Sequence, residues 1–580
     1  MYLSGIDTNT GTHTVRSSPP PANKMSTPSS RPSSIAIDDL QDETHESATS
    51  PPAGTITILR SPVQDSSNNS EDREYDDLLQ SSSTATLLSL TNSIRGERPL
   101  PSLHSPLMFR DVPFSVTFLL HLVVLLLLTD RLRSDQERRN DRSEVVGELL
   151  DDEVSQTSDI EDVVLALHSL CLVNLLFALG WLLSFVFYSK RRFVQGSWAL
   201  NIVGLSALAV FLLFLLDLSY ALFLGILCAG IVGLDLVWYV RCNGGLDFVA
   251  VFFDLVVELL MTHPALGYVT CTTLAVYTVW VSWVCTTIGY VERELSLWSF
   301  SMMYLAFHFY WTSNVLKNIL TVVASGTTMI WYYQNEPSDV SAATDERESV
   351  AGRDASRDET TDHAQQDLMI GYLDRKVVLH YARCALSSSF GSICIGSLLC
   401  PLGHLVWIAL RCARRDESVL SRWFVLLRSE RVEHFIRTYH KYSFVHIAGY
   451  NKPYYVAAHD SWELIEYYGV EAIVDDDLTS RILLFAGNGW AGVMSTLTAL
   501  ALSSVSTHAT FCTLVSFTLC YTTISLASQV IAAVIKTLFV CFAENPERLS
   551  QLHPLIYHRF VRLTELKSFH DHRASANCRP

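Results

Sequence analysis

Long apolar runs alternate with polar segments from about residue 113 to residue 542. The runs cover residues 113–129, 163–188, 198–216, 219–240, 266–290, 297–324, 387–410, 482–502 and 508–542. A helix of about 20 apolar residues crosses the hydrocarbon core of a bilayer. The pattern therefore predicts an all-α polytopic membrane bundle of about ten transmembrane helices, with the less apolar segment 442–468 as a further candidate.

The segment 246–261 has a different pattern from the spans around it. Asp247, Asp254 and Glu258 share one helical face, and most of the other residues are Phe, Val or Leu. This favours a helix that lies in the membrane interface or re-enters it. A true span is the alternative. The basic residues between 411 and 441 indicate a cytosolic location, and the count of spans from a cytosolic N-terminus reaches it only with one more crossing.

Composition agrees with one large transmembrane unit. Hydrophobic residues make up 49% of the 580 positions and charged residues 17%, and the mean hydropathy is +0.23. We expect a transmembrane domain at 109–548 and a cytosolic C-terminal tail at 549–580. Residues 1–108 are rich in Ser and Pro and poor in apolar residues, which predicts a disordered cytosolic tail. The hydrophilic loops are expected at 130–162, 334–380 and 411–441.

The formal net charge of -17 does not point to a basic partner. The acidic residues gather in the N-terminal tail and in the loops, for example at 148–161 and 345–367, where they are interpreted as solvated linkers. No nucleic-acid partner is expected. Lys190, Arg191 and Arg192 follow the second apolar run and indicate a cytoplasmic turn, in agreement with a cytosolic N-terminus.

Nothing in the sequence points to an enzyme. The 13 cysteines lie mostly inside apolar runs, where they act as small hydrophobic residues. The sequence contains no HExxH, GxSxG or P-loop pattern and no paired Cys and His spacing typical of a metal site. We therefore expect no catalytic residues, no cofactor and no metal.

Several short stretches carry recognisable motifs. They read FRDVPF at 109–114, FYWTSNVLKN at 309–318 with ASG at 324–326 and WYY at 331–333, GSICIGSLL at 391–399, IAGY at 447–450 with AAHDSW at 457–462, and KTLFVCF at 536–542. Together they resemble the choline transporter-like family, which includes the fungal pH-nine-sensitive proteins. The resemblance covers about residues 109–548.

The resemblance implies a multi-pass plasma-membrane transporter that moves choline or a related small organic cation by alternating access, in contact with membrane lipid. Lys536 and Asn545 stand where the family usually has Asp, and YSF at 442–444 replaces its usual Asn-Ala-Tyr. These departures leave another solute, such as ethanolamine, as an alternative. A membrane scaffold that does not transport is a second alternative. The oligomeric state is left open.

A choline-like cargo is a quaternary ammonium ion without an N–H group, so aromatic ring faces are expected to hold it. The densest supply of such rings is on the runs 266–290 and 297–324, and Trp311 is the leading candidate because it lies mid-helix. Asp235 either balances the cation or pairs with Arg241 near its helix end. For each aromatic residue, ordinary packing is the alternative. The candidate substrate-binding residues are Trp311, Tyr310, Tyr304, Asn314, Trp280, Tyr277 and Asp235.

Other polar residues inside apolar runs are candidates for separate roles. His121, His168 and His308 are interpreted as proton relays or as hydrogen-bonded packing residues. Lys317 and Lys536 would repel a cation unless a carboxylate pairs with them.

The glycine and serine repeat in the run 387–410 is interpreted as structural. Small residues let two membrane helices approach closely, and direct contact with the substrate is the alternative. A proline that follows in the same run is expected to kink the helix and free a carbonyl group, a plausible cation ligand. The residues of this motif are Gly391, Ser392, Gly396, Ser397 and Pro401.

Overall fold

The computed structural model describes nine ranges of the chain. They are residues 108–146, 151–214, 219–242, 246–291, 300–334, 374–415, 430–467, 478–502 and 509–562. Apart from Met108, the N-terminal tail expected at 1–108 lies outside them. All regular structure in these ranges is helical, which confirms the predicted all-α class.

The described helices, besides a last one at 554–562, follow one another in this order. They are α2 (Val112–Val146), α3 (Asp151–Phe187), α4 (Lys190–Phe214), α5 (Ser219–Cys242), α6 (Leu246–Thr262), α7 (Pro264–Tyr290), α8 (Phe300–Gln334), a helix at 374–386, α11 (Phe390–Arg415), α13 (Glu430–Thr438), α14 (Ser443–Tyr450), α15 (Tyr454–Tyr467), α17 (Leu478–Leu502), α18 (Ala509–Ala527), α19 (Gln529–Glu544) and α20 (Pro546–Leu552).

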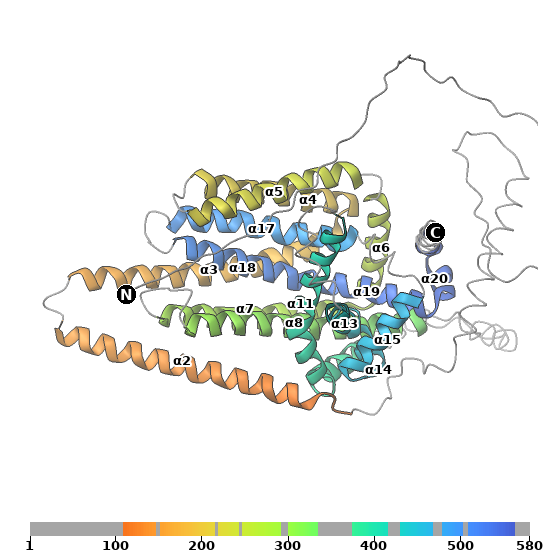
Figure 1. Ribbon diagram of the computed structural model, residues 1–580, viewed down its shortest axis with the longest axis horizontal. Coiled ribbons are helices and arrows are strands. Elements are labelled where there is room, and N and C mark those ends of the chain that lie inside the picture. The colour runs from red at the N-terminus through yellow and green to blue at the C-terminus, as the bar shows by residue number, and fades with distance from the viewer. Residues whose placement is uncertain are drawn as a thin grey trace, which may run out of the picture. The chain divides into compact units, whose positions relative to one another are not determined.

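Seven stretches in the described ranges are long and apolar enough to cross a membrane, and the bent pair α18 and α19 makes an eighth. α8 runs beside α7 and the other long helices (Figure 1). The chain is therefore a multi-pass membrane protein. The seven stretches are Val112–Arg138, Val164–Phe187, Lys190–Phe214, Ala221–Val240, Pro264–Tyr290, Phe390–Trp407 and Thr479–Ala501.

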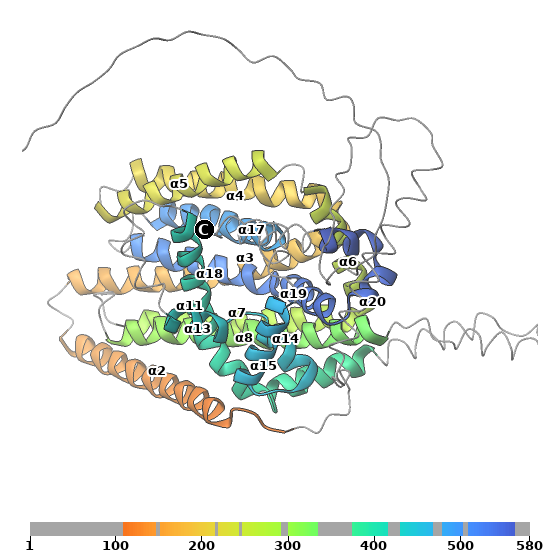
Figure 2. The ribbon, with the colours of Figure 1, turned by 45° about the vertical axis from the view of Figure 1, so that its right-hand side comes forward.

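The amphipathic segment forms α6, which lies across one end of the bundle instead of running along it (Figure 2). Phe252, Phe253 and Val256 on its inner face are buried, while Asp254 and Glu258 are exposed. A helix of this orientation and polarity fits the membrane interface. The structure therefore does not support the alternative interpretation of 246–261 as a true span.

All three predicted hydrophilic loops contain more helix than expected where they are described. α2 continues to Val146 and α3 begins at Asp151, so the segment 130–162 is helical where it is described. Charged residues can extend a helix into water when they pair one turn apart, as Arg133 and Glu137 do at 2.9 Å. The helices at 374–386 and 430–438 likewise enter the segments 334–380 and 411–441.

Two predicted spans are broken. The segment 442–468 forms α14 and α15, which are separated at Asn451 (φ 48°) just before Pro453. Proline has no amide proton, so a helix that reaches it from the N-terminal side tends to end there. The run 508–542 forms α18 and α19, which bend by 48° at Ser528.

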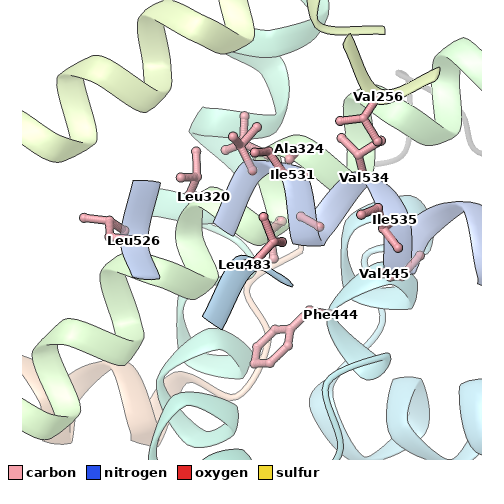
Figure 3. Packing of buried hydrophobic residues seen from close by; sticks show 14 of the residues in the cluster. Val256, Leu320, Ala324, Phe444, Val445, Leu483, Leu526, Ile531, Val534 and Ile535 are labelled. Carbon is pink, nitrogen blue, oxygen red and sulfur yellow. The ribbon is translucent and has the colours of Figure 1, made fainter. Parts of the chain in front are cut away.

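α19 lies in the hydrophobic core of the bundle. It is buried almost all round, from Val530 to Ala543, as expected of a helix that is apolar on every face. Its Val534 packs near Val256 of α6, and its Ile535 lies near Val445 of α14 (Figure 3). Short helices from the end of the bundle are thus joined to the long ones through α19.

α4 and α17 approach each other through glycines. A Cβ atom added to Gly204 would collide with the backbone of Gly489, and one added to Gly492 would collide with the backbone of Gly204. We call these three residues the glycine interface. Such close backbone contact is a main source of helix association in lipid, where the hydrophobic effect contributes little.

Candidate functional site

α8 brings most of the predicted substrate-binding residues to one region, where it packs against α2, α7 and α11. Phe118 and His121 come from α2, Trp280 comes from α7, and the rest come from α8. We call this set the aromatic cluster. Its members are Phe118, His121, Trp280, Tyr304, Phe307, His308 and Trp311.

Trp311 is buried and contacts the rings of Phe118, His121 and Phe307. Its ring centroid is 4.9 Å from that of His121 and 5.2 Å from that of Phe118. Its indole nitrogen donates a hydrogen bond to the Cys394 carbonyl of α11 at 3.1 Å. The polar atom of Trp311 is therefore used to join α8 to α11, and its ring surface faces α2.

A chain of hydrogen bonds crosses the cluster from α7 to α2. Trp280 Nε1 donates to His308 Nε2 at 3.0 Å, and His308 Nδ1 lies 3.1 Å from His121 Nε2. Tyr304 completes the contact, because its hydroxyl donates to the His121 carbonyl at 2.7 Å. The structure thus links two of the predicted relay histidines to two of the predicted substrate-binding residues.

Tyr310 and Asn314 lie beside the cluster and face other partners. The Tyr310 hydroxyl donates to the Leu398 carbonyl of α11 at 2.8 Å. Asn314 donates to the Tyr310 carbonyl within α8 at 2.8 Å, and Asn318 reaches across to Ser397 Oγ at 2.9 Å. The bonds of Tyr310 and Asn318 hold the middle of α8 against α11.

Tyr277 extends the cluster towards α18. Its ring centroid is 5.6 Å from that of Trp280, and its hydroxyl donates to Thr522 Oγ1 at 2.6 Å. Thr522 was not among the sequence candidates, because a threonine in an apolar run gives no distinctive signal.

Asp235 does not join the cluster. It lies on α5 and accepts a hydrogen bond from Asn201 Nδ2 of α4 at 2.9 Å, and α4 and α5 are on the opposite side of the bundle from α2 (Figure 1). The side chain of Arg241, its alternative partner, lies outside the described residues.

The glycine and serine motif of α11 meets the segment before the first span. A Cβ atom on Gly391 would collide with the Asp111 carbonyl, and one on Gly396 would collide with the rings of Phe444 and Tyr454. Ser392 Oγ donates to Asp111 Oδ2 at 2.6 Å. These contacts place Gly391, Gly396 and Ser392 at helix packing positions.

Asp111 ties three segments together. Besides the bond from Ser392, its Oδ2 accepts the Tyr454 amide at the start of α15 at 2.8 Å. The neighbouring Arg110 amide donates to the Ser388 carbonyl at 2.8 Å. The start of α2 is thus fixed to α11 and α15 at once.

Pro401 lies inside α11, which continues through it. About two turns and one turn before it, the Cys394 and Leu398 carbonyls accept the bonds from Trp311 and Tyr310. Two residues after it, Gly403 lies against the Tyr439 carbonyl. The carbonyls described near the proline are therefore engaged by side chains of α8.

His440 lies in the turn between α13 and α14, next to Cys400 of α11. Its Nε2 donates to the Ala458 carbonyl at 3.0 Å, and its own carbonyl accepts the Cys400 thiol at 3.5 Å. Burial lowers the pKa of His440 to about 4, although the bond to Ala458 opposes this shift. The side chain is therefore neutral at pH 7.

A second polar cluster surrounds Glu544 at the end of α19. Tyr333 and Tyr450 both donate to its Oε2, at 2.8 Å and 2.9 Å, and His446 Nε2 lies 3.5 Å from its Oε1. This cluster was not predicted from the sequence, because its members are far apart in the chain. It joins the ends of α8, α14 and α19.

The two lysines inside apolar runs are buried or shielded. Lys317 Nζ lies 5.9 Å from the ring centroid of Tyr521, a cation-π contact, and Lys536 is buried on α19. In the described ranges, no group of three or more His, Cys, Asp or Glu side chains could hold a metal ion.

Comparison with known proteins points to one family. The family model described as "Plasma-membrane choline transporter" matches residues 226–547, which is more than half of the chain. This match includes α7, α8, α11 and α19, whereas α2 precedes it.

Individual relatives agree with the family match. The chain is 23% identical to a CTL-like protein of Dictyostelium discoideum over 360 residues, which is 60% of this chain and 58% of that protein. It is 24% identical to the protein PNS1 of Gibberella zeae over 276 residues, 45% and 44% of the two chains. With PNS1 of Saccharomyces cerevisiae it shares 25% over 272 residues, 43% of each. The matches thus span about half the length of these curated relatives.

Proposed function

Because the chain belongs to the choline transporter-like family, we propose that it moves choline or a related small organic cation across the plasma membrane by alternating access. The observation that carries this proposal is the aromatic cluster. Rings from α2, α7 and α8 pack together there, with centroids 4.9 to 5.7 Å from that of His121 for Trp311, Phe118, Tyr304 and Phe307.

Aromatic surfaces suit this cargo for a physical reason. A quaternary ammonium ion has no N–H to donate, so a carboxylate gains no hydrogen bond from it, whereas the negative face of a ring attracts it. One such contact contributes about 0.5 to 2 kcal/mol, depending on how dry the site is. Trp311 offers a large indole ring in contact with His121 and Phe118.

Alternating access requires some contacts to open while others persist. α2 has the least buried membrane stretch of the seven, with 17% of it buried, so little packing resists its movement away from α8. The contact of α8 with α11 depends on a few bonds from side chains to carbonyls, such as Tyr310 to Leu398. We propose that these two contacts rearrange during transport.

The proposed orientation has a cytosolic N-terminus. α2 begins at the same end of the bundle as the turn between α3 and α4 (Figure 1). That turn carries Lys190, Arg191 and Arg192, and Lys190 donates to the Val186 carbonyl at 3.1 Å. Basic residues of this kind favour the cytosolic side. We propose a transport role without enzymatic activity, with membrane lipid as the partner of the exposed faces.

Labelled choline uptake tests the proposal in cells that lack their own choline transporters. We expect saturable uptake with the wild-type chain and at least a tenfold loss for Trp311→Ala, since about 1.4 kcal/mol of lost contact is tenfold in affinity. Trp311→Phe keeps a ring and should retain more uptake than Trp311→Ala.

Trp198→Ala is the matched control, because Trp198 stacks on Tyr239 of α5 at 4.0 Å and is not part of the cluster. Surface abundance is measured for every variant. Equal uptake by Trp311→Ala and Trp198→Ala would remove Trp311 from the site. Uptake of labelled ethanolamine but not of choline would change the substrate, and uptake of neither by a chain present at the surface would overturn the transport proposal.

A further inference from the structure

The hydrogen bonds of the aromatic cluster have a fixed direction. The indole nitrogen of Trp280 can only donate, so His308 Nε2, 3.0 Å away, must accept. An imidazole that accepts at Nε2 carries its proton on Nδ1. That proton points at His121 Nε2, 3.1 Å away, which must therefore accept as well.

It follows that His121 carries its proton on Nδ1. Both histidines are neutral in this arrangement, because a proton added to His308 Nε2 would face the Trp280 N–H, and one added to His121 Nε2 would face the His308 Nδ1–H. His121 Nδ1 is thus the last donor of a chain that begins at Trp280.

This last donor has no partner within the described part of the chain. The His121 side chain is 7% exposed, and its Nδ1 is buried without a hydrogen-bond acceptor. The Tyr304 hydroxyl bonds to the His121 carbonyl and not to Nδ1. Nearly all buried donors in native proteins are satisfied, so an unsatisfied one calls for an explanation.

The surroundings of this donor are those that a cation would select. The rings of Phe118, Tyr304, Phe307 and Trp311 lie around the ring of His121. One N–H group on a ring that contacts four aromatic side chains matches a ligand that carries an acceptor oxygen close to a quaternary ammonium group.

We propose that His121 Nδ1 donates a hydrogen bond to the hydroxyl oxygen of a cationic amino alcohol, and that this bond selects hydroxylated quaternary ammonium ions from hydroxyl-free ones of the same charge. The inference rests on the proposed function, since it names the substrate class of the same site. The ligand reaches Nδ1 when the Trp311 ring, which now contacts the His121 ring, moves aside, while the bond between His308 and His121 is kept.

Two substitutions separate the two ring nitrogens of His121. The amide nitrogen of Asn stands in the δ position and can replace the Nδ1 donor, whereas the amide group of Gln reaches the ε position and replaces Nε2. His121→Gln therefore keeps an acceptor for His308 and loses the donor for the ligand. His121→Asn keeps the donor and loses the acceptor for His308.

The experiment compares choline with ethyltrimethylammonium as competitors of labelled choline uptake. For the wild type we expect about a tenfold preference for choline, the value of one hydrogen bond of about 1.4 kcal/mol. His121→Asn should keep most of this preference. His121→Gln should bind choline about tenfold more weakly and ethyltrimethylammonium as before, so that its preference falls to about one.

Thermal stabilisation of the purified protein by each solute gives the same ratio without transport, which covers a variant that binds but does not move its cargo. Equal competition by the two solutes in the wild type would overturn the inference and leave choline transport intact. A tenfold preference that persists in His121→Gln would overturn it too. Failure of the proposed function is distinct, because the wild type would then show no choline uptake at all.

Discussion

The glycine interface and the aromatic cluster are two ways of holding membrane helices together. At the glycine interface, the backbones of α4 and α17 touch at Gly204, Gly489 and Gly492. In the region of the cluster, long side chains of α8 span the gap and donate to carbonyls of α11, as Trp311 and Tyr310 do. Both regions lie between helices of the same bundle.

The two regions differ in whether their contacts can be replaced by new ones when the helices move. A backbone contact through glycines depends on distance alone and is lost when the helices separate by about an ångström, because dispersion forces fall steeply. A hydrogen bond from a flexible side chain can find a new acceptor after the helices move. We therefore expect α4 and α17 to move as one unit and α8 to move against α2 and α11.

The largest effect is expected from Gly204→Val in the glycine interface. The new Cβ and its methyl groups would be forced against the backbone of Gly489, and overpacking costs typically about 1 to 3 kcal/mol and occasionally more. We expect loss of the monodisperse peak in size-exclusion chromatography and a large fall in surface abundance.

Gly233→Val on α5 is the matched control, because no atom lies within 4 Å of the position of its new Cβ. It should behave as the wild type does. If both variants were equally stable, the contact of α4 with α17 at the glycine interface would not be rigid.

A smaller loss is expected from Asp111→Ala, at the start of α2. The substitution removes the acceptor of Ser392 and of the Tyr454 amide, and bonds to a charged group contribute about 1.5 to 3 kcal/mol each at most. The backbone of Asp111 is also left-handed, with φ 50°, which Ala tolerates less well than Asp or Asn.

Asp111→Asn keeps an acceptor oxygen and the tolerance for this backbone, so it should lose less stability than Asp111→Ala. The thermal unfolding of the purified proteins in detergent measures the difference. Identical unfolding temperatures for Asp111→Ala and the wild type would show that α2 is not held at this point.

The smallest effect is expected from the pH dependence at His440. Its pKa in the folded protein is about 4, below the ordinary value of about 6.5. The unfolded chain therefore binds a proton at higher pH than the folded protein does. The free energy of unfolding is highest above pH 6.5 and decreases as the pH falls towards 4. At pH 5 the loss is about 2 kcal/mol.

His440→Gln keeps the donor to the Ala458 carbonyl and has no group that titrates in this range. Between pH 7 and pH 5 its free energy of unfolding should fall by about 2 kcal/mol less than that of the wild type. Hydrogen exchange should locate the change in α14 and α15 and not in α4 and α17. An equal fall in both proteins would contradict the role of His440.

Several spans were predictable because their signal is local. A run of about 20 apolar residues decides a span by itself, and α4, α5, α7 and α17 follow their runs closely. The exposed carboxylates of α6 likewise predicted an interfacial helix. The break at Asn451 had a local signal in Pro453, whereas the bend at Ser528 had none and depends on packing around α19.

The site was less accessible to prediction because its contacts join distant positions. His121 and His308 were recognised as unusual in apolar runs, but their pairing across 187 residues is a product of the fold. Asp235 was grouped with the aromatic candidates by chemical type alone, and the structure pairs it with Asn201. The role of each candidate in binding stays a prediction until uptake is measured.

The bonds of Asp111 have a consequence for the biosynthesis of the chain. Asp111 precedes Ser392 by 281 residues and Tyr454 by 343 residues. At a synthesis rate of about 5 to 20 residues per second, the first span waits roughly 20 to 70 s in the membrane before its final partner exists. During that time α2 can contact only the helices already made, such as α7 and α8, and premature termination of the chain before α15 would leave its beginning without the bond from Tyr454.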